Sequence, residues 1–290
     1  MKTNAIIRIA IFFLAILVLL GILLSILVFD MFVVDGKVQF DRDGSIEAAI
    51  EMVGQGNVTS DVRNIEIEWV AGSITIQPDA SVSEIQITEY CSRESKYQMI
   101  YRQSGQTLKI QFCEESIKFP TLVTSVDVSK ELFITVPADW TCNKLEIDAA
   151  STEVEVCDLK INEVNFDGAS GRLNLTNCTI SDLDIDTASG DVEFSGVLKE
   201  LDFDAASAKF FGEFLETPDR LDLDTMSGDL EIILPENCGF TCKLDTMSGD
   251  FDSDFEFGSH DGFYIHGDGG CQINVSAMSG DVNILKGIGK

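Results

Sequence analysis

Aspartates recur at two fixed places in the C-terminal half of the chain, and carboxylates in such a pattern could bind cations. One set stands three residues before a serine: Asp148, Asp167, Asp186, Asp204, Asp224 and Asp245. A second set stands two residues after the serine: Asp191, Asp229, Asp250 and Asp281. Calcium prefers oxygen ligands from carboxylates and carbonyls. The candidate calcium ligands are Asp186, Asp191, Asp224, Asp229, Asp245 and Asp250. The alternative is that aspartates favour corners because they bond their own backbone.

These aspartates belong to a cassette of the form L-x-I-D-x-x-S-G-D-V-x-I. Its clearest copies are Leu183–Phe194 and Leu221–Ile232. The cassette serines are separated by 19, 19, 18, 20, 21 and 31 residues, and they are Ser151, Ser170, Ser189, Ser207, Ser227, Ser248 and Ser279. A period near 20 residues is typical of a solenoid, in which each unit buries its apolar face against its neighbours.

The spacing inside the cassette predicts two strands and a corner. Apolar residues lie six and four residues before each serine, and three and five residues after it. Alternation with a period of two indicates β-strand on both sides. The switch from even to odd offsets requires a turn, which Ser-Gly can make because glycine tolerates positive φ. Three methionines directly precede their serines, and we expect them to pack as a stack at the corner: Met226, Met247 and Met278.

We therefore expect an all-β fold, a single-stranded β-solenoid or β-helix of about 19-residue coils. Ile65–Ile76 is a diverged eighth copy, with Ala71 in place of the serine. The Ser207 and Ser248 copies are degenerate, and the long step before Ser279 contains an extra loop around 255–270. The last cassette ends the chain without an obvious cap, and the bare end motivates a hypothesis of end-to-end association.

The region between 71 and 151 breaks the period. Runs with strand-like alternation occur at 84–90, 98–103, 107–112 and 131–136, and Ser104-Gly105 predicts a hairpin turn. These runs predict an antiparallel N-terminal elaboration of the solenoid. Residues 30–63 have few periodic signals, and we interpret them as a linker or stalk with a short helix near Ser45–Val53. The β-strand-repeat domain is accordingly predicted at 64–290.

An uncharged segment near the N-terminus predicts a membrane span. Ile9–Phe29 comprises 21 residues without a charge, enough for one transmembrane helix. The alternative of a cleaved signal peptide fits less well, because the run is long and lacks an Ala-x-Ala site. Lys2 and Arg8 precede the span and acidic residues follow it. We expect a cytoplasmic tail at 1–8, a signal anchor at 9–29 and a single-pass cell-membrane protein with an extracytoplasmic body.

The charge balance excludes some partners. The chain has 20 Lys and Arg against 49 Asp and Glu, a net charge of −29. Such a field repels nucleic acid and anionic headgroups. The sequence contains no nucleophile elbow, phosphate loop or zinc signature. Nearby pairs of acids arise by coincidence in so acidic a chain, so we expect a protein that is not an enzyme.

Eight cysteines permit disulfides in an extracytoplasmic body. The best candidate pairs are Cys157 with Cys178, on successive coils, and Cys238 with Cys242, which flank one turn. The alternative is that all eight are buried free thiols that pack as small apolar groups. Metal binding by these cysteines is less favoured, since no CxxC occurs.

The repeats carry a resemblance to a known family. A proline-led strand enters the cassette twice, from Thr135 as TVPADWTCNKLEIDAASTEVEV and from Ile233 as ILPENCGFTCKLDTMSGDF. Together with the SGD(V/L)x(I/F) units, this pattern resembles the bacterial putative-adhesin family of β-strand-repeat proteins, a domain family of unknown function. The resemblance covers about 64–285. It implies a β-solenoid-like envelope domain, commonly tethered to the membrane and sometimes associated with envelope-stress systems.

Three functions follow as hypotheses. The favoured one is a membrane-anchored extracytoplasmic interaction or scaffold protein of the cell envelope, with a cell-wall polymer or an envelope protein as partner. The second is an accessory sensor of envelope stress, which would need a membrane partner because its cytoplasmic tail is short. The third is a carbohydrate-binding or carbohydrate-active solenoid, which a groove lined with aromatic residues and a close carboxylate pair would favour. No cofactor is expected, apart from the candidate calcium.

Overall fold

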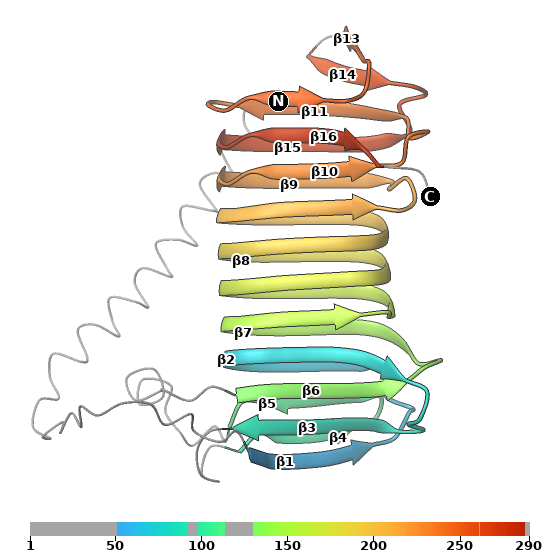
Figure 1. Ribbon diagram of the computed structural model, residues 1–290, viewed down its shortest axis with the longest axis vertical. Coiled ribbons are helices and arrows are strands. Elements are labelled where there is room, and N and C mark those ends of the chain that lie inside the picture. The colour runs from blue at the N-terminus through green and yellow to red at the C-terminus, as the bar shows by residue number, and fades with distance from the viewer. Residues whose placement is uncertain (1–50, 92–97, 114–129, 261, 288–290) are drawn as a thin grey trace, which may run out of the picture. The chain divides into compact units, whose positions relative to one another are not determined.

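The computed structural model describes residues 51–91, 98–113, 130–260 and 262–287, and this part of the chain is built from β-strands (Figure 1). The regular stack consists of β2 (Asn64–Asp79), β7 (Thr141–Cys157), β8 (Lys160–Phe214), β9 (Arg220–Ser227) and β10 (Leu230–Leu234). The N-terminal end adds β1 (Glu51–Val58), β3 (Ile85–Cys91), β4 (Ile100–Ser104), β5 (Thr107–Gln111) and β6 (Lys130–Pro137). The C-terminal end adds β11 (Phe240–Thr246), β12 (Phe251–Ser253), β13 (Gly258–His260), β14 (Phe263–His266), β15 (Cys271–Ser279) and β16 (Val282–Lys286).

Each regular coil consists of two strand segments that meet at the cassette serine. Corresponding residues of successive coils pair in parallel: Ser151 pairs with Ser170, and Ser207 with Ser227. The segments before the serines form one face of the stack, here named the pre-corner face, and the segments after them form the post-corner face. β8 runs through several coils without interruption. The expected all-β, solenoid-like fold is confirmed.

The core lies between the two faces, where the alternation places it. In the Ser189 coil Leu183, Ile185, Val192 and Phe194 are all buried. Burying such side chains contributes about 1.5–3 kcal/mol each. Two threonines lie on the inner side, two residues before their serines. Thr187 Oγ1 donates to the carbonyl of Ser189 at 3.1 Å, and Thr225 Oγ1 donates to the carbonyl of Ser227 at 3.3 Å. The predicted even-to-odd switch at the serine is therefore confirmed.

The corner glycines are required by close stacking as well as by backbone conformation. Gly171 and Gly190 both have a φ of 131°. A Cβ on Gly190 would lie 2.1 Å from the carbonyl oxygen of Gly171 in the next coil. Gly280 and Gly249 show the same relation to their neighbours, at 2.0 Å. Because real Cβ atoms do not approach a carbonyl so closely, a side chain here would force the coils apart.

The N-terminal end confirms part of the prediction and extends it. The diverged copy is a true coil, because Ala71 pairs with Ser151. The hairpin also exists, with β4 and β5 antiparallel around Gly105 (φ 59°). The elaboration is mixed rather than antiparallel, however, because β5 and β6 both pair parallel to β2 and continue its two faces. Antiparallel strands then follow, β4 beside β5 and β3 beside β6.

The predicted stalk is wrong in its C-terminal part. β1 covers residues assigned to the stalk and pairs antiparallel with β3, from Glu51 opposite Cys91 to Val58 opposite Ile85. The β domain therefore begins before the predicted boundary at 64. The predicted short helix ends inside β1 and is wrong there, and its earlier residues lie outside the described part of the chain.

A buried ion pair closes the core at this end. Lys130 and Glu89 are both fully buried and form a salt bridge. Lys130 Nζ also donates to the carbonyl of Phe112 at 2.6 Å and lies 4.1 Å from the centre of its ring. The Met99 amide donates to Glu89 Oε2 at 2.9 Å. These bonds offset the cost of desolvating the two charges, so removing one partner should be strongly destabilising.

The C-terminal coils are not stacked in sequence order. On the pre-corner face the order is β9, β15, β11, β14 and β13, and on the post-corner face it is β10, β16 and β12. The chain therefore builds the outermost coil first, turns back through β13 and β14, and inserts the Ser279 cassette between the Ser227 and Ser248 coils. The predicted bare end is wrong, because the last cassette is an interior coil. The degenerate Ser248 copy is the outermost cassette coil: β11 pairs with β15 on one side and with β14 on the other, whereas β12 pairs only with β16.

The cysteines are free thiols in this structure, so the two candidate disulfides are not formed. Cys157 lies on the outside, where its Sγ is 3.6 Å from Glu155 Oε1. Cys178 lies beyond a second corner at Asn177 (φ 54°), and it is buried. The two cysteines therefore point to opposite sides. Cys238 and Cys242 are both buried, and Phe240 lies between them on the same inner side.

The predicted membrane span, 9–29, and the cytoplasmic tail lie outside the described residues. Within the described ranges, no helix is long and apolar enough to cross a bilayer.

Candidate functional site

The pre-corner face carries a dense set of carboxylates on its outer side. They occupy odd offsets before each serine, which the pleat turns outward. In the Ser189 coil these are Asp182, Asp184 and Asp186, all exposed. Equivalent positions on the neighbouring coils hold Glu66, Glu68, Glu146, Asp148, Glu163, Asp167, Glu200, Asp202, Asp204, Asp222 and Asp224. Since parallel strands lie about 4.8 Å apart, these groups form vertical ladders across the face.

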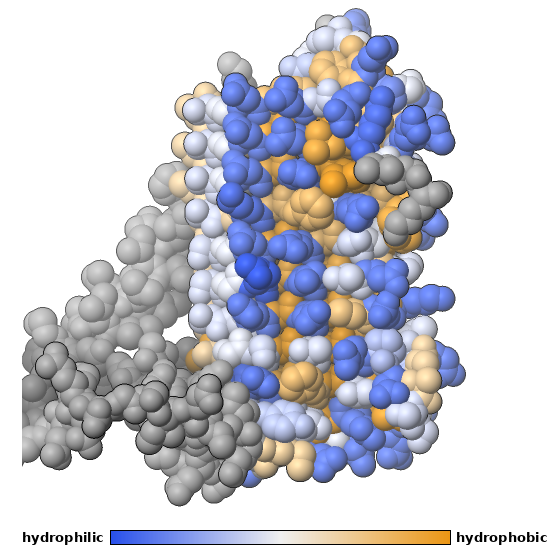
Figure 2. Space-filling view, in the orientation of Figure 1, coloured by the Kyte–Doolittle hydropathy of each residue, from blue (hydrophilic) through white to orange (hydrophobic). Residues whose placement is uncertain are grey.

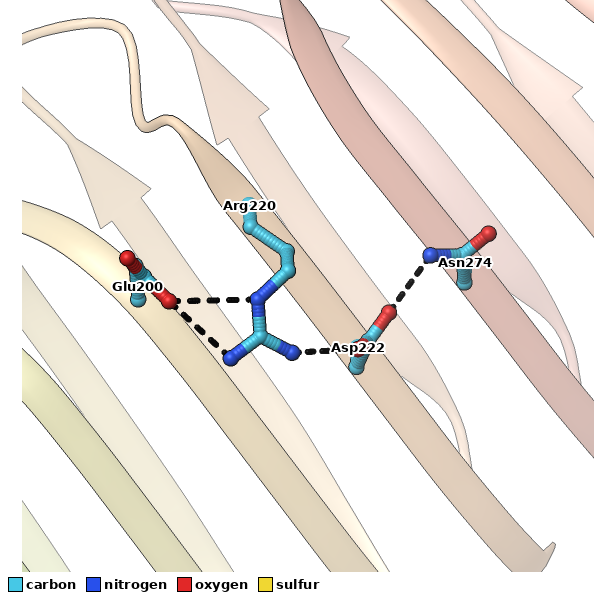
Figure 3. A network of polar contacts seen from close by, with 4 residues as sticks. All are labelled: Glu200, Arg220, Asp222 and Asn274. Carbon is cyan, nitrogen blue, oxygen red and sulfur yellow. Dashed lines mark hydrogen bonds and ion pairs between the residues drawn. The ribbon is translucent and has the colours of Figure 1, made fainter.

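A polar network on this face crosses three coils (Figure 3). Arg220 donates to Glu200 Oε2 from Nε at 3.2 Å and from Nη2 at 3.1 Å, and it also bonds Asp222. Asn274 Nδ2 donates to Asp222 Oδ1 at 2.6 Å. Arg220 thus neutralises the face locally, and the coil order brings Asn274 next to Asp222 although 52 residues separate them in sequence.

The carboxylates of the face affect one another. Burial raises the pKa of Asp184, and the neighbouring Asp182 and Asp167 raise it further. Burial also raises the pKa of Asp186 and Asp202, with added repulsion from adjacent carboxylates. At the N-terminal end, a hydrogen bond from Lys109 instead lowers the pKa of Glu68. The middle of the face therefore concentrates negative charge at an energetic cost.

The post-corner face is mixed in character. Its outer positions include Arg172, 3.8 Å from Asp191, and Lys209, 3.3 Å from Asp229. They also include Phe211, which is 37% exposed. Figure 2 shows this face, where polar ladders alternate with apolar patches. Cations also pair with acids on the pre-corner face, where Lys144 lies 3.1 Å from Glu146 and 3.2 Å from Glu163. The two faces differ in number, because the outer positions of the post-corner face hold fewer carboxylates.

The predicted calcium residues divide between the two faces. Asp186, Asp224 and Asp245 lie on the pre-corner face, and Asp191, Asp229 and Asp250 on the post-corner face. The inserted coil also separates residues that the sequence order makes neighbours. Ser276 lies between Asp224 and Asp245.

The post-corner aspartates form backbone hydrogen bonds between coils. Asp229 Oδ1 accepts from the amide of Asp281 at 3.2 Å, and Asp281 Oδ1 accepts from the amide of Asp250 at 2.9 Å. Both bonds join neighbouring coils at the corner. The bond from the Asp281 amide lowers the pKa of Asp229, and a hydrogen bond from Lys209 lowers it further. Among the described residues, no group of three or more His, Cys, Asp or Glu side chains converges as a metal site would require. Calcium binding stays a prediction.

Sequence reasoning missed most of the acidic face. Only the residues three before each serine were singled out, whereas Asp184, Asp202 and Asp222 form an equally continuous ladder five residues before it. The sequence pattern could have identified these residues. Before each serine the even offsets are buried, so the same alternation predicts that every odd offset points outward.

A shallow groove crosses the corner edge near the N-terminal end. Its volume is about 460 Å³, and it is lined by Gly72, Ser73, Glu131, Ser151, Thr152, Glu153 and Gly171. None of these lining residues, all of which belong to the described part of the chain, has an aromatic ring. Two carboxylates and open surroundings give it the character of a surface depression, without the enclosure that small-molecule sites usually have.

The chain is similar to solved structures of three bacterial proteins, each at low sequence identity. A putative cell adhesion protein from Clostridium sporogenes is 13% identical over 82% of this chain and 100% of that chain, with a TM-score of 0.35. A putative adhesin from Bacteroides fragilis is 12% identical over 84% and 100%, with a TM-score of 0.40. One from Parabacteroides distasonis is 11% identical over 83% and 98%, with a TM-score of 0.39. The comparison with curated proteins finds no match.

The family comparison is more extensive. The profile of the family described as Toastrack DUF4097 matches residues 62–210 and 199–285. These two matches span β2 to β16 and include every cassette serine. Because the matches cover more than half of the sequence, the chain belongs to the Toastrack DUF4097 family.

Proposed function

We propose that this chain is an adhesin-like, membrane-anchored interaction or scaffold protein of the bacterial cell envelope, with the pre-corner face as its binding surface. The observation that carries the proposal is the contrast between that face and the rest of the stack. Its carboxylates are continuous over several coils, and the pKa values of Asp184, Asp186 and Asp202 are raised by partial burial and, further, by repulsion from neighbouring carboxylates. An open face of this kind suits a large partner, whereas catalysis on a small substrate favours an enclosed site.

The chemistry of the face defines the partner. A surface of closely spaced carboxylates attracts cationic groups and repels anionic ones. The partner is therefore a wall polymer or envelope protein that presents cationic groups, or a polyanion bridged to the face by divalent cations. The second mode gives the calcium prediction a testable form, since calcium would then be required for binding.

The apolar segment Ile9–Phe29 supports the membrane anchor, and the acidic residues that follow it support an extracytoplasmic body. The anchor would hold the body near the outer surface of the membrane.

Binding of the full chain, in detergent micelles, to purified cell-wall polymers tests the proposal, with and without calcium. We expect binding that weakens as salt rises, because exposed charges are screened. The triple variant Asp184→Asn, Asp186→Asn, Asp202→Asn should reduce affinity by about tenfold, since each lost surface charge contact is worth up to about 1 kcal/mol.

The matched control changes the same number of charges on the other face. Glu155, Glu193 and Glu231 lie on the outer side of the post-corner strands, and their replacement by glutamine removes three carboxylates there. This variant should bind as the wild type does. Equal loss in both triple variants would reduce the effect to net charge, and no binding to any polymer would count against a wall partner.

Carbohydrate binding is a second candidate, because aromatic rings gather at the C-terminal end. Phe257 is 38% exposed, and its ring centre lies 4.9 Å from that of Tyr264 and 5.8 Å from that of Phe251. Exposed aromatic faces can pack against sugar rings. Phe257→Ala should weaken polymer binding in this case, with little effect of salt, and unchanged binding would count against it.

A further inference from the structure

The coil order brings three methionines to the same place on three successive coils. Met226, Met278 and Met247 each stand directly before a cassette serine. On one side of them, Ala277 pairs with both Thr225 and Thr246. On the other side, Gly280 packs between Gly228 and Gly249. A Cβ added to Gly280 would lie 2.0 Å from the carbonyl oxygen of Gly228, and a Cβ added to Gly249 would lie 2.0 Å from that of Gly280. The methionines are therefore held in register from both sides, with Met278 in the middle.

These side chains point outward at the corner. Thr225 and Ala277, the residues just before Met226 and Met278, are buried with 6% and 4% exposure, so alternation turns the methionines to the surface. Met278 is 48% exposed and Met247 is 79% exposed. Apolar atoms are visible at the upper end of the left-hand edge in Figure 2. The same position holds Val70, Ala150, Ala169, Ala188 and Ala206 in the other coils, so the thioethers occur only where the three coils are adjacent.

An exposed row of methionines has a specific chemistry. Neighbouring strands lie about 4.8 Å apart, and a methionine side chain has three rotatable bonds and a polarizable sulfur. Three thioethers on successive coils can therefore turn toward one ion between them. Thioethers are soft, neutral ligands that select soft ions such as Cu(I) over the hard cations that carboxylates prefer. We propose that Met226, Met278 and Met247 form a binding site for a soft monovalent metal ion, Cu(I) in the cell.

The surroundings favour such an ion. The net charge of −29 attracts cations to the body. Each methionine of the site is followed three residues later by an aspartate, on the other side of the Ser-Gly turn: Asp229, Asp281 and Asp250. These carboxylates place negative charge near the site. Thioether ligands do not titrate, and binding should therefore be independent of pH between about 5 and 8, unlike binding by thiolates or imidazoles.

Titration of the full chain, labelled with 13C at the methionine methyl groups, with Ag(I) tests the proposal by NMR. Ag(I) has the same charge and softness as Cu(I) and is not oxidised in air. Cys113 and Cys157 are the cysteines with partial exposure, so both are first replaced by serine to remove competing thiols. We expect the methyl signals of Met226, Met278 and Met247 to shift together and to saturate at one ion. Met278→Leu, which keeps size and apolar character, should lower the affinity by about tenfold or more, because it removes the central of three soft ligands.

The chain contains an internal control. Met52 is 55% exposed on β1, where it pairs with Tyr90. Its methyl signal should not shift at one equivalent of Ag(I), and Met52→Leu should leave the affinity unchanged. Calcium at a hundredfold excess should not displace the silver. The proposal is overturned if Met52 shifts in parallel with the three, if the three signals stay in place, or if Met278→Leu binds as the parent does.

Discussion

The two faces of the stack share one backbone pattern and differ in what they present to solvent. Both alternate buried and outward residues from the same serine corner. The outer positions of the pre-corner face are filled with carboxylates such as Asp184, Asp186 and Asp202, whose pKa values are raised by burial and by one another. The post-corner face pairs its acids with cations and backbone amides, as Asp229 does with Lys209 and with the amide of Asp281. The same scaffold therefore carries one face whose acids bond between coils and one with a denser set of carboxylates, which we propose as a binding surface.

The largest expected effect concerns the corner that joins the faces. Gly190→Ala should cost about 3–5 kcal/mol, because it combines positive-φ strain with a Cβ placed against a carbonyl. Gly105 also has positive φ, but a Cβ there meets nothing within 4 Å. Gly105→Ala should cost only about 1 kcal/mol. Chemical denaturation of both variants measures the difference, and equal losses would show that close stacking at the corner adds nothing to the strain.

The next effect separates the two faces by stability. The triple variant Asp184→Asn, Asp186→Asn, Asp202→Asn should raise the free energy of unfolding at pH 7 by about 1 kcal/mol, because like charges on neighbouring strands repel. The triple variant Glu155→Gln, Glu193→Gln, Glu231→Gln should change it by less than about 0.5 kcal/mol. Thermal unfolding at low salt measures both. A gain that is equal on the two faces would refute the contrast.

The same comparison predicts a pH dependence. A carboxyl whose pKa is raised in the folded state destabilises the fold as pH rises from the unfolded value, about 4, through the raised value. The stability gained by the pre-corner triple variant should therefore be largest at pH 7 and fade as pH falls to about 4.

For Asp229 the sign of the pH dependence is opposite, because its pKa is lowered. Asp229→Asn should destabilise the protein at pH 7, and the loss should shrink as the pH falls below about 4. Urea midpoints across this range would detect a reversed sign.

The smallest effect concerns a thiol of the post-corner face. Burial raises the pKa of Cys157 and Cys178 to about 11 in each case, so neither is a ready nucleophile at pH 8. Cys157 nevertheless lies on the outer side, and Cys178 is 1% exposed. Alkylation followed by mass spectrometry should modify Cys157 slowly and Cys178 only after unfolding. Equal rates in the native state would place both thiols on the same side.

Local patterns predicted what depends on local geometry. The alternation around each serine identified core residues such as Leu183 and Val192, and the Ser-Gly pair identified the corner. The same rule would also have placed Cys157 outside, since it lies at an even offset after Ser151.

The order of the coils could not be predicted in this way. The Ser248 and Ser279 cassettes share the Met-Ser-Gly-Asp corner, and only tertiary packing decides which of them lies beside Ser227. The long connection between them was visible, but its role in returning the chain to an inner position was not. β1 was also missed, because it contains Gly54 and Gly56, which weaken the strand signal. Its partner, β3, is also far from it in sequence. The methionine site depends on that same coil order.

Carboxylate footprinting tests the functional contrast between the faces most directly. Carbodiimide coupling labels exposed carboxyl groups, and mass spectrometry then reports each labelled residue with and without a bound wall polymer. We predict that the polymer protects Asp182, Asp184, Asp186 and Asp202, and that labelling of Glu155, Glu193 and Glu231 is unchanged. Protection confined to the post-corner residues, or spread equally over both faces, would contradict the assignment of the pre-corner face as the binding surface.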